Sequence, residues 1–186
     1  MEAELIMRAR QGDDEAYETL VRQHQEAVFR LAYLITGDAD EAEDVAQETF
    51  IRAFRDLHRF DISRPLRPWL LRITRNTALN NRRSIKRYLT TIRRFLTETP
   101  DSVSDAETEY TRQWEARTLW QAVQQLSQAD QEVIYLRHFL ELSVQETAAI
   151  IDVAPGTVKS RLSRALSRLR QVVQQDFPVL YEGRQL

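Results

Sequence analysis

The chain has 186 residues, of which 42% are hydrophobic, and its 26 basic and 28 acidic side chains leave a formal net charge of −2. This length allows one medium domain or two small ones, and the low content of Gly (4) and Pro (5) favours helices over a turn-rich β protein. The absence of cysteine excludes disulfides, thiolate catalysis and cysteine-based zinc sites, and without a signal-peptide pattern or a long apolar run we expect a soluble cytoplasmic protein.

Residues 1–56 carry 14 acids against 6 bases, and their apolar residues recur at helical spacing. A first helix is predicted to begin near Gly12-Asp13. The stretch TGDAD (36–40) predicts a turn and an N-cap, with acids at the positive end of the following helix. We expect that helix to run over residues 41–57 and to bury Ala42, Val45, Ala46, Phe50, Ala53 and Phe54.

Residues 57–96 reverse the charge, with 1 acid against 11 bases. Two prolines predict a loop over residues 58–68, and Pro68 suits the first turn of a helix running from Trp69 past Arg83. Leu79 falls among the basic residues of that helix, which otherwise lie in one arc of roughly 120°. The members of this arc are Arg72, Arg75, Asn76, Arg82, Arg83 and Lys86. Such a face suits phosphate contacts and some base readout, and the alternatives are a solvated face or a membrane-surface helix.

Residues 97–132 are acidic again, with 8 acids against 2 bases, and the stretch TETPDSVSDAETE (97–109) has no apolar stripe. It predicts a mobile linker. Beyond it we expect helices near residues 114–126, 128–139, 144–151 and 156–173. The predicted fold is all-α, with two small helical bundles joined by a flexible acidic linker. The expected ranges are 1–95 for the first bundle, 96–111 for the linker and 112–186 for the second bundle.

The second half contains the pattern of a helix-turn-helix. Ser143 and Glu146 form a capping box that begins a short helix, and the stretch IDVAPG (151–156) predicts a tight turn with Val153 as its apolar plug. The next helix has a buried stripe of Val158, Leu162, Ala165, Leu166 and Leu169. Its other residues are hydroxyls and bases, namely Thr157, Lys159, Ser160, Arg161, Ser163, Arg164, Ser167 and Arg168. Two helices in this arrangement present the second one to the major groove of DNA, and an ordinary solvated helix is the alternative.

The acidic helix over residues 41–57 suits a different partner, because its charge repels DNA. Its exposed positions, Glu41, Asp44, Gln47, Glu48 and Arg55, suit a basic or mixed protein surface. A merely solvated acidic face is the alternative. The glycine and carboxylate spacing of an EF-hand loop is absent.

Three stretches, in this order, resemble a bacterial sigma factor of the extracytoplasmic-function (ECF) type in the sigma-70 superfamily. DADEAEDVAQETFIRAFRDLHRFD (38–61) and RPLRPWLLRITRNTAL (64–79) resemble two pieces of its second conserved region. LSVQETAAIIDVAPGTVKSRLSRALSRLR (142–170) resembles its fourth. The similarity covers about residues 12–95 and 112–171. It implies an RNA polymerase sigma factor that binds core polymerase and recognises the −10 and −35 promoter elements.

The resemblance also implies a role for each segment. The acidic helix would dock on the β′ coiled coil of core polymerase through Asp44, Gln47, Glu48 and Phe50. The loop 58–67 and the basic helix would recognise and help to melt the −10 element, with Arg72, Arg75, Asn76, Asn80 and Arg83 in contact with DNA. The last helix would read the −35 element through Thr157, Lys159, Ser160, Arg161 and Arg164, and the linker would thread the polymerase channel.

The expected partners are core RNA polymerase (the β′ and β subunits), promoter DNA and a cognate anti-sigma factor. No cofactor, metal, enzymatic activity or membrane insertion is expected. Residues 152 and 154 depart from the family, which usually has Gly and then Pro around the plug, whereas this chain has Asp152 and Ala154. Since Asp tolerates a left-handed backbone, we expect the turn to survive.

The alternative function is an autonomous helix-turn-helix transcriptional regulator. That interpretation leaves the acidic helix and the first basic helix without a role. An enzyme is weakly supported, because the three histidines are scattered and no glycine-rich phosphate loop is present.

Overall fold

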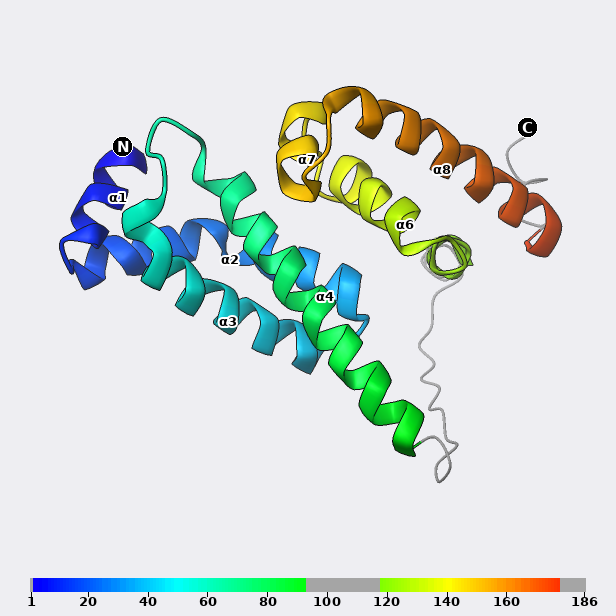
Figure 1. Cartoon of the computed structure of the whole chain (residues 1–186), viewed down its shortest axis with the longest axis horizontal. Coiled ribbons are helices and arrows are strands. Elements are labelled where there is room, and N and C mark those ends of the chain that lie inside the picture. Colours follow the sequence, from blue (N-terminus) through cyan, green and yellow to red (C-terminus); the bar gives the residue numbers. More distant parts are fainter. Residues whose placement is uncertain (1, 93–117, 178–186) are drawn as a thin grey trace, which may run out of the picture.

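The computed structural model describes residues 2–92 and 118–177, with the backbone alone described for residues 82–92. Within these ranges every regular element is helical, which confirms the predicted all-α class. The elements are α1 (Glu2–Arg10), α2 (Asp14–Thr36), α3 (Ala39–Asp56), η1 (Leu57–Arg59), α4 (Leu66–Ile92), α6 (Gln128–Ile134), η2 (Tyr135–Phe139, a π-helix), α7 (Val144–Ile151) and α8 (Pro155–Asp176), as Figure 1 shows. The predicted linker 96–111 and both predicted domain boundaries lie outside the described residues.

The turn between α2 and α3 forms as the sequence predicts. Gly37 ends α2 with φ 80°, and its amide donates to the carbonyl of Tyr33. Asp38 then caps α3, because its side chain accepts a hydrogen bond from the amide of Glu41 at 2.9 Å. Asp13 caps α2 in the same way through the amide of Ala16 at 3.1 Å. These caps satisfy backbone amides that have no partner within their own helix.

The inward stripe of α3 differs from the prediction at Phe54 and Thr49, and Ala46 and Phe50 are only half-buried. Phe54 was predicted to be buried, but it is 44% exposed, and its ring lies 4.6 Å from the ring of Tyr17 in an edge-on contact. The stripe instead passes through Val45, Thr49 and Ala53, at spacings of four residues. Thr49 can occupy it because its hydroxyl donates to the carbonyl of Val45 at 2.7 Å.

α4 begins at Leu66, three residues before the predicted start at Trp69. Leu66 is 2% exposed and packs in a cluster with residues of α1, α2 and the end of α3. Pro68 still lies in the first turn, where its missing amide hydrogen breaks no helical bond. Burial of Leu66 therefore moves the start of the helix to the residue that follows Pro65.

The two halves of the chain pack against each other through α4. This helix contacts α2 and α3 and also contacts α7 (Figure 1). Leu71 and Leu79 belong to one apolar cluster with residues of α6, α7 and α8. Leu79 is only 8% exposed, which explains why an apolar residue interrupts the basic arc of α4. The basic face of α4 is thus partly an internal contact surface.

Candidate nucleic-acid interface

The second half folds as a helix-turn-helix, and its local signals act as predicted. Ser143 accepts from the amide of Glu146 at 3.1 Å, and Glu146 accepts from the amide of Ser143 at 2.8 Å, which confirms the capping box. The Ser143 hydrogen bonds lower the pKa of Glu146. Asp152 takes the left-handed conformation (φ 58°, ψ 54°) and ends α7, so the turn survives without glycine. Pro155 then begins α8.

α8 has one apolar and one basic side. Val158 and Ala165 are fully buried, whereas Leu166, predicted in the same stripe, is 37% exposed. Leu166 lies at the edge of the stripe, whereas Ala165 at its centre is buried as predicted. The predicted −35 residues Lys159, Ser160 and Arg164 are exposed, and Thr157 and Arg161 are half-buried.

Two contacts shape the basic side of α8. Arg164 donates from its Nε to the carbonyl of Ser160 at 3.2 Å, and its two Nη nitrogens take no part in that bond. Arg168 instead pairs with Asp130 of α6 at 2.6 Å, and Asp130 is only 3% exposed. Arg168 therefore helps to attach α8 to α6, a role that the sequence does not signal.

The predicted −10 residues of α4 lie beside the second half. Arg75 donates to Glu132 of α6 at 2.8 Å, with the two side chains 22% and 6% exposed. Arg72 lies 3.6 Å from Asp152, at the end of α7, and is 48% exposed. Asn76 and Asn80 are exposed. The side chain of Arg83 lies outside the described residues.

The loop before α4 is ordered by its own side chains. Asp61 accepts from the amide of Ser63 at 3.0 Å and from the Ser63 hydroxyl at 2.7 Å, and these bonds lower the pKa of Asp61. Phe60 is buried, and the centre of its ring lies 4.9 Å from that of Trp69, so the two aromatic side chains pack together under the loop. Ile62 and Ser63 are exposed above it. Arg67 turns away from the loop and donates to the carbonyl of Leu140 at 3.2 Å.

The acidic face of α3 contains exposed apolar side chains that the sequence analysis missed. Of the predicted polymerase-binding residues, Asp44 and Gln47 are exposed, Glu48 pairs with Arg52 at 2.6 Å, and Phe50 is half-buried against the core. Ile51 is 62% exposed and lies one helical turn from Gln47. The sequence signal for this exposure is the position of Ile51 outside the inward apolar stripe of α3. An exposed isoleucine next to carboxylates suits a protein partner better than plain solvent.

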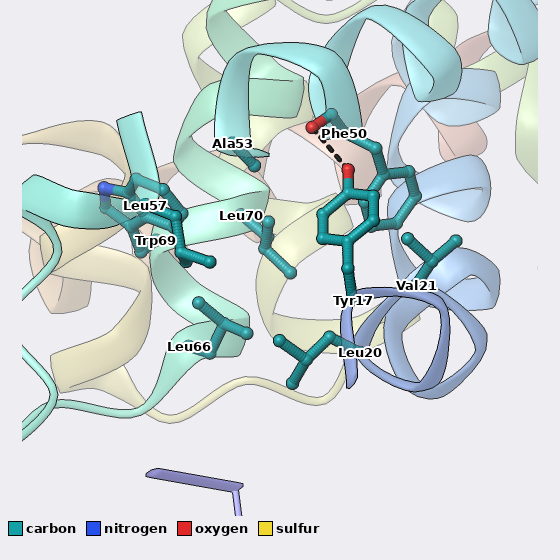
Figure 2. Close-up of a pocket in the computed structure, with 9 residues that line it drawn as sticks. All are labelled: Tyr17, Leu20, Val21, Phe50, Ala53, Leu57, Leu66, Trp69 and Leu70. Atoms are coloured by element: carbon teal, nitrogen blue, oxygen red, sulfur yellow. Dashed lines mark hydrogen bonds between the residues drawn. The ribbon is translucent and has the colours of Figure 1, made fainter. Parts of the chain in front are cut away.

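The small pocket in the first half is apolar and is not a candidate site. Figure 2 shows it between α2, α3 and α4, with Leu57, Leu66 and Trp69 on one side and Tyr17 and Phe50 on the other. It has room only for a molecule of about the size of water. Burial raises the pKa of Tyr17 to about 12, and its hydroxyl donates to the carbonyl of Phe50 at 2.7 Å. The pocket therefore belongs to the core.

The described part of the chain offers neither a metal-binding cluster nor a membrane-spanning helix. Residues 2–92 and 118–177 contain no group of three or more His, Cys, Asp or Glu side chains placed to hold a metal ion. No helix in the same ranges combines the length and the apolar character that crossing a membrane requires.

Comparison with known families matches both halves of the chain. The family Sigma-70 region 2 matches residues 20–96, and Sigma-70, region 4 matches residues 116–169. The chain is 32% identical to the ECF RNA polymerase sigma factor SigW of Bacillus subtilis, over 89% of this chain and 93% of SigW. It is also 32% identical to the RNA polymerase sigma-H factor of Pseudomonas aeruginosa, over 97% of this chain and 96% of that protein.

Solved structures agree with the sequence comparisons. CnrH, solved in complex with the cytosolic domain of CnrY, matches 94% of this chain and 98% of its own, with a TM-score of 0.70 and 25% identity. The sigma factor RpoE of Bartonella quintana, solved with the anti-sigma factor NepR, matches 86% and 98%, with a TM-score of 0.66 and 26% identity. Since both regions match in one chain, an autonomous regulator is not favoured. The chain belongs to the ECF group of the sigma-70 family and is an RNA polymerase sigma factor.

Proposed function

We propose that the protein recognises the −35 element of its promoters with α8 and the −10 element with α4 and the loop before it. The −35 assignment depends on one observation: α8 exposes Lys159, Ser160 and Arg164 on one side while its opposite side is buried. Arginine and lysine donate to guanine edges in the major groove, and hydroxyls suit phosphates and base edges. Thr157 and Arg161 complete the proposed surface.

On the −10 side, we assign DNA contacts to Arg72, Arg75, Asn76, Asn80 and Arg83 together with the loop 58–67. In the described arrangement Arg75 is held by Glu132, and α7 contacts α4. DNA phosphates and Glu132 compete for the same guanidinium group. Promoter binding therefore requires α4 to separate from α6 and α7, and binding to core polymerase supplies the free energy for this separation.

The acidic face of α3 is the proposed docking surface for core polymerase. Asp44, Gln47 and Glu48 provide its polar part, as expected from the resemblance. Ile51 adds an apolar contact in place of Phe50, whose side chain packs mostly inside the protein. The expected partner surface is the β′ coiled coil, which would present basic and apolar groups to this face.

The protein has no proposed catalytic role of its own, since the family acts as an initiation factor for polymerase. We place it in the cytoplasm, where its polymerase and DNA are found. A regulatory anti-sigma factor is a further proposed partner. The support is that RpoE, which shares this fold, was solved in complex with the anti-sigma factor NepR, and CnrH with the cytosolic domain of CnrY.

Run-off transcription with purified core polymerase tests this function. The templates come from a random promoter library, so that the selected sequences themselves define the promoter elements. We expect specific transcripts only when the protein is present, and enriched templates with two conserved elements separated by a fixed spacer. Failure to direct initiation, combined with tight sequence-specific duplex binding by the protein alone, would support an autonomous regulator instead.

A further inference from the structure

The N-terminal helix α1 lies outside the part of the chain that matches the sigma-70 families, since that match begins at residue 20. Its apolar side packs into the first half through Ile6 and Ala9, which are 1% and 2% exposed. The same cluster contains Leu57, Phe60 and Leu66, the residues at the two ends of the loop before α4. Figure 1 shows α1 next to this loop.

Arg10 of α1 holds the beginning of the loop. Its Nε donates to the carbonyl of Leu57 at 3.0 Å, and its Nη2 donates to the carbonyl of Phe60. The carbonyl of Leu57 also accepts the amide of Phe60 at 3.1 Å, and a positive charge at the carbonyl end of a helix is favourable. The planar guanidinium group fixes two carbonyls at once, which a lysine cannot do in the same geometry.

Glu2 of α1 holds the other end of the loop. One carboxylate oxygen accepts from the amide of Leu66, the first residue of α4, at 3.4 Å. The other lies 3.2 Å from Nε2 of His24, a buried residue of α2. A carboxylate at the start of a helix is favourable, and its second contact fixes the orientation of the side chain. One nine-residue helix thus contacts both ends of the loop.

We infer that α1 is a positioning element for base recognition, and that Arg10 and Glu2 preset the conformation of the loop before it meets DNA. The inference rests on the proposed role of this loop in recognising the −10 element. A loop that is already ordered loses less conformational entropy when it captures an unstacked base, which raises affinity, and it cannot readjust to fit a different base, which raises selectivity. Neither residue needs to touch the DNA.

Hydrogen exchange in the free protein gives a first test that does not depend on promoter recognition. Arg10→Met keeps the aliphatic stem and removes both donors, and the matched control is Arg8→Met, which removes an arginine of α1 that pairs with Asp13 instead. We expect exchange at the amides of Phe60 and Arg64 to be at least ten-fold faster in Arg10→Met than in Arg8→Met. Equal hydrogen-exchange rates at these two amides in Arg10→Met and Arg8→Met overturn the inference.

The second test compares −10 selectivity in the holoenzyme. Arg10→Met should lower the preference for the captured −10 base about five- to ten-fold, while −35 preference and core binding stay as in the wild-type protein. A general loss of folding would lower all three together. Wild-type selectivity in Arg10→Met overturns the inference. If the wild-type holoenzyme shows no −10 preference, the proposed function fails instead, although the exchange result still stands. Arg10→Lys, which keeps the charge, should behave like Arg10→Met.

Discussion

Individual arginines of this sigma factor have distinct roles although they look alike in the sequence. Arg164 is exposed on the side of α8 that is proposed to read DNA, whereas Arg168, four residues later, pairs with the buried Asp130. Arg10 orders a loop, and Arg75 joins the two halves. Pattern and charge predict that a helix is basic, but the partner of each side chain depends on residues far away in the chain.

The arginines of the proposed −35 surface of α8 should contribute directly to promoter affinity. Arg161→Ala or Arg164→Ala should weaken binding of the holoenzyme to promoter DNA by about 1–3 kcal/mol if the side chain contacts a base. The selectivity at one −35 position should fall as well. Filter binding or fluorescence anisotropy measures the affinity, and Arg170→Ala, an exposed position near the end of α8, is the control. Unchanged −35 selectivity in both variants would remove them from base readout.

His24 predicts a pH dependence of stability. Burial, the largest cause, lowers the pKa of His24, the charge of Arg67 lowers it further, and Glu2 opposes the shift. The unfolded chain therefore takes up a proton at this residue before the folded chain does, so the free energy of unfolding falls as the pH drops below about 6.5. Urea unfolding at pH 7.5 and 5.5 should show a smaller loss for His24→Gln than for the wild-type protein. An equal loss in both proteins would contradict this assignment.

At the scale of elements, α3 combines acidic and exposed apolar residues on one face. Glu48→Lys should weaken binding to core polymerase, because it inverts a charge on this face, and Ile51→Ser should weaken it by about 1–2 kcal/mol through lost apolar contact. Both variants should fold normally, since residue 48 is on the surface and Ile51 is 62% exposed. Competition binding to core polymerase measures the effect, with Glu26→Lys, at an exposed acidic position of α2, as the control. Normal holoenzyme assembly by both variants would rule out this docking surface.

Helices and caps were predictable where the signal is local. The capping box at Ser143, the caps at Asp13 and Asp38 and the left-handed Asp152 each depend on residues within a few positions of one another. The predicted start of α4 was three residues too late, because the burial of Leu66 against α1 outweighed the local effect of two prolines. The predicted burial of Phe54 and Leu166 was wrong, because each lies at the edge of an apolar stripe, where contacts with neighbouring elements determine burial.

Across the whole molecule, the sequence does not identify the residues that join the two halves. Arg75 and Glu132 are 57 residues apart, and each looks like an ordinary surface charge in its own helix. Acid–base pairing could be anticipated from the segregated charges, but the contact also buries Leu71 and Leu79 in a shared apolar cluster. Salt alone should therefore change the compactness of the free protein only modestly, since screening weakens charge pairs and leaves apolar burial in place.

The Arg75–Glu132 pair should oppose DNA binding by the free protein. Glu132→Gln should destabilise the closed arrangement by about 1–2 kcal/mol and so raise the affinity for random-sequence single-stranded DNA about five- to thirty-fold. Fluorescence anisotropy with a labelled oligonucleotide measures this affinity. Glu26→Gln makes the same charge change at an exposed position of α2 and should have little effect. Equal affinities in the two variants would show that this pair does not restrain the DNA-binding surface.

Three arginines of α4 contact three different parts of the second half: Arg67 the carbonyl of Leu140, Arg72 the carboxylate of Asp152, and Arg75 that of Glu132. Proteins usually bind DNA more weakly as salt rises, because each cation that meets a phosphate displaces a counterion. In the free chain, the carboxylates of Asp152 and Glu132 already neutralise part of the positive charge of α4. DNA binding by the free chain therefore exchanges one set of anions for another, and its affinity should fall with salt less steeply than its number of basic residues implies.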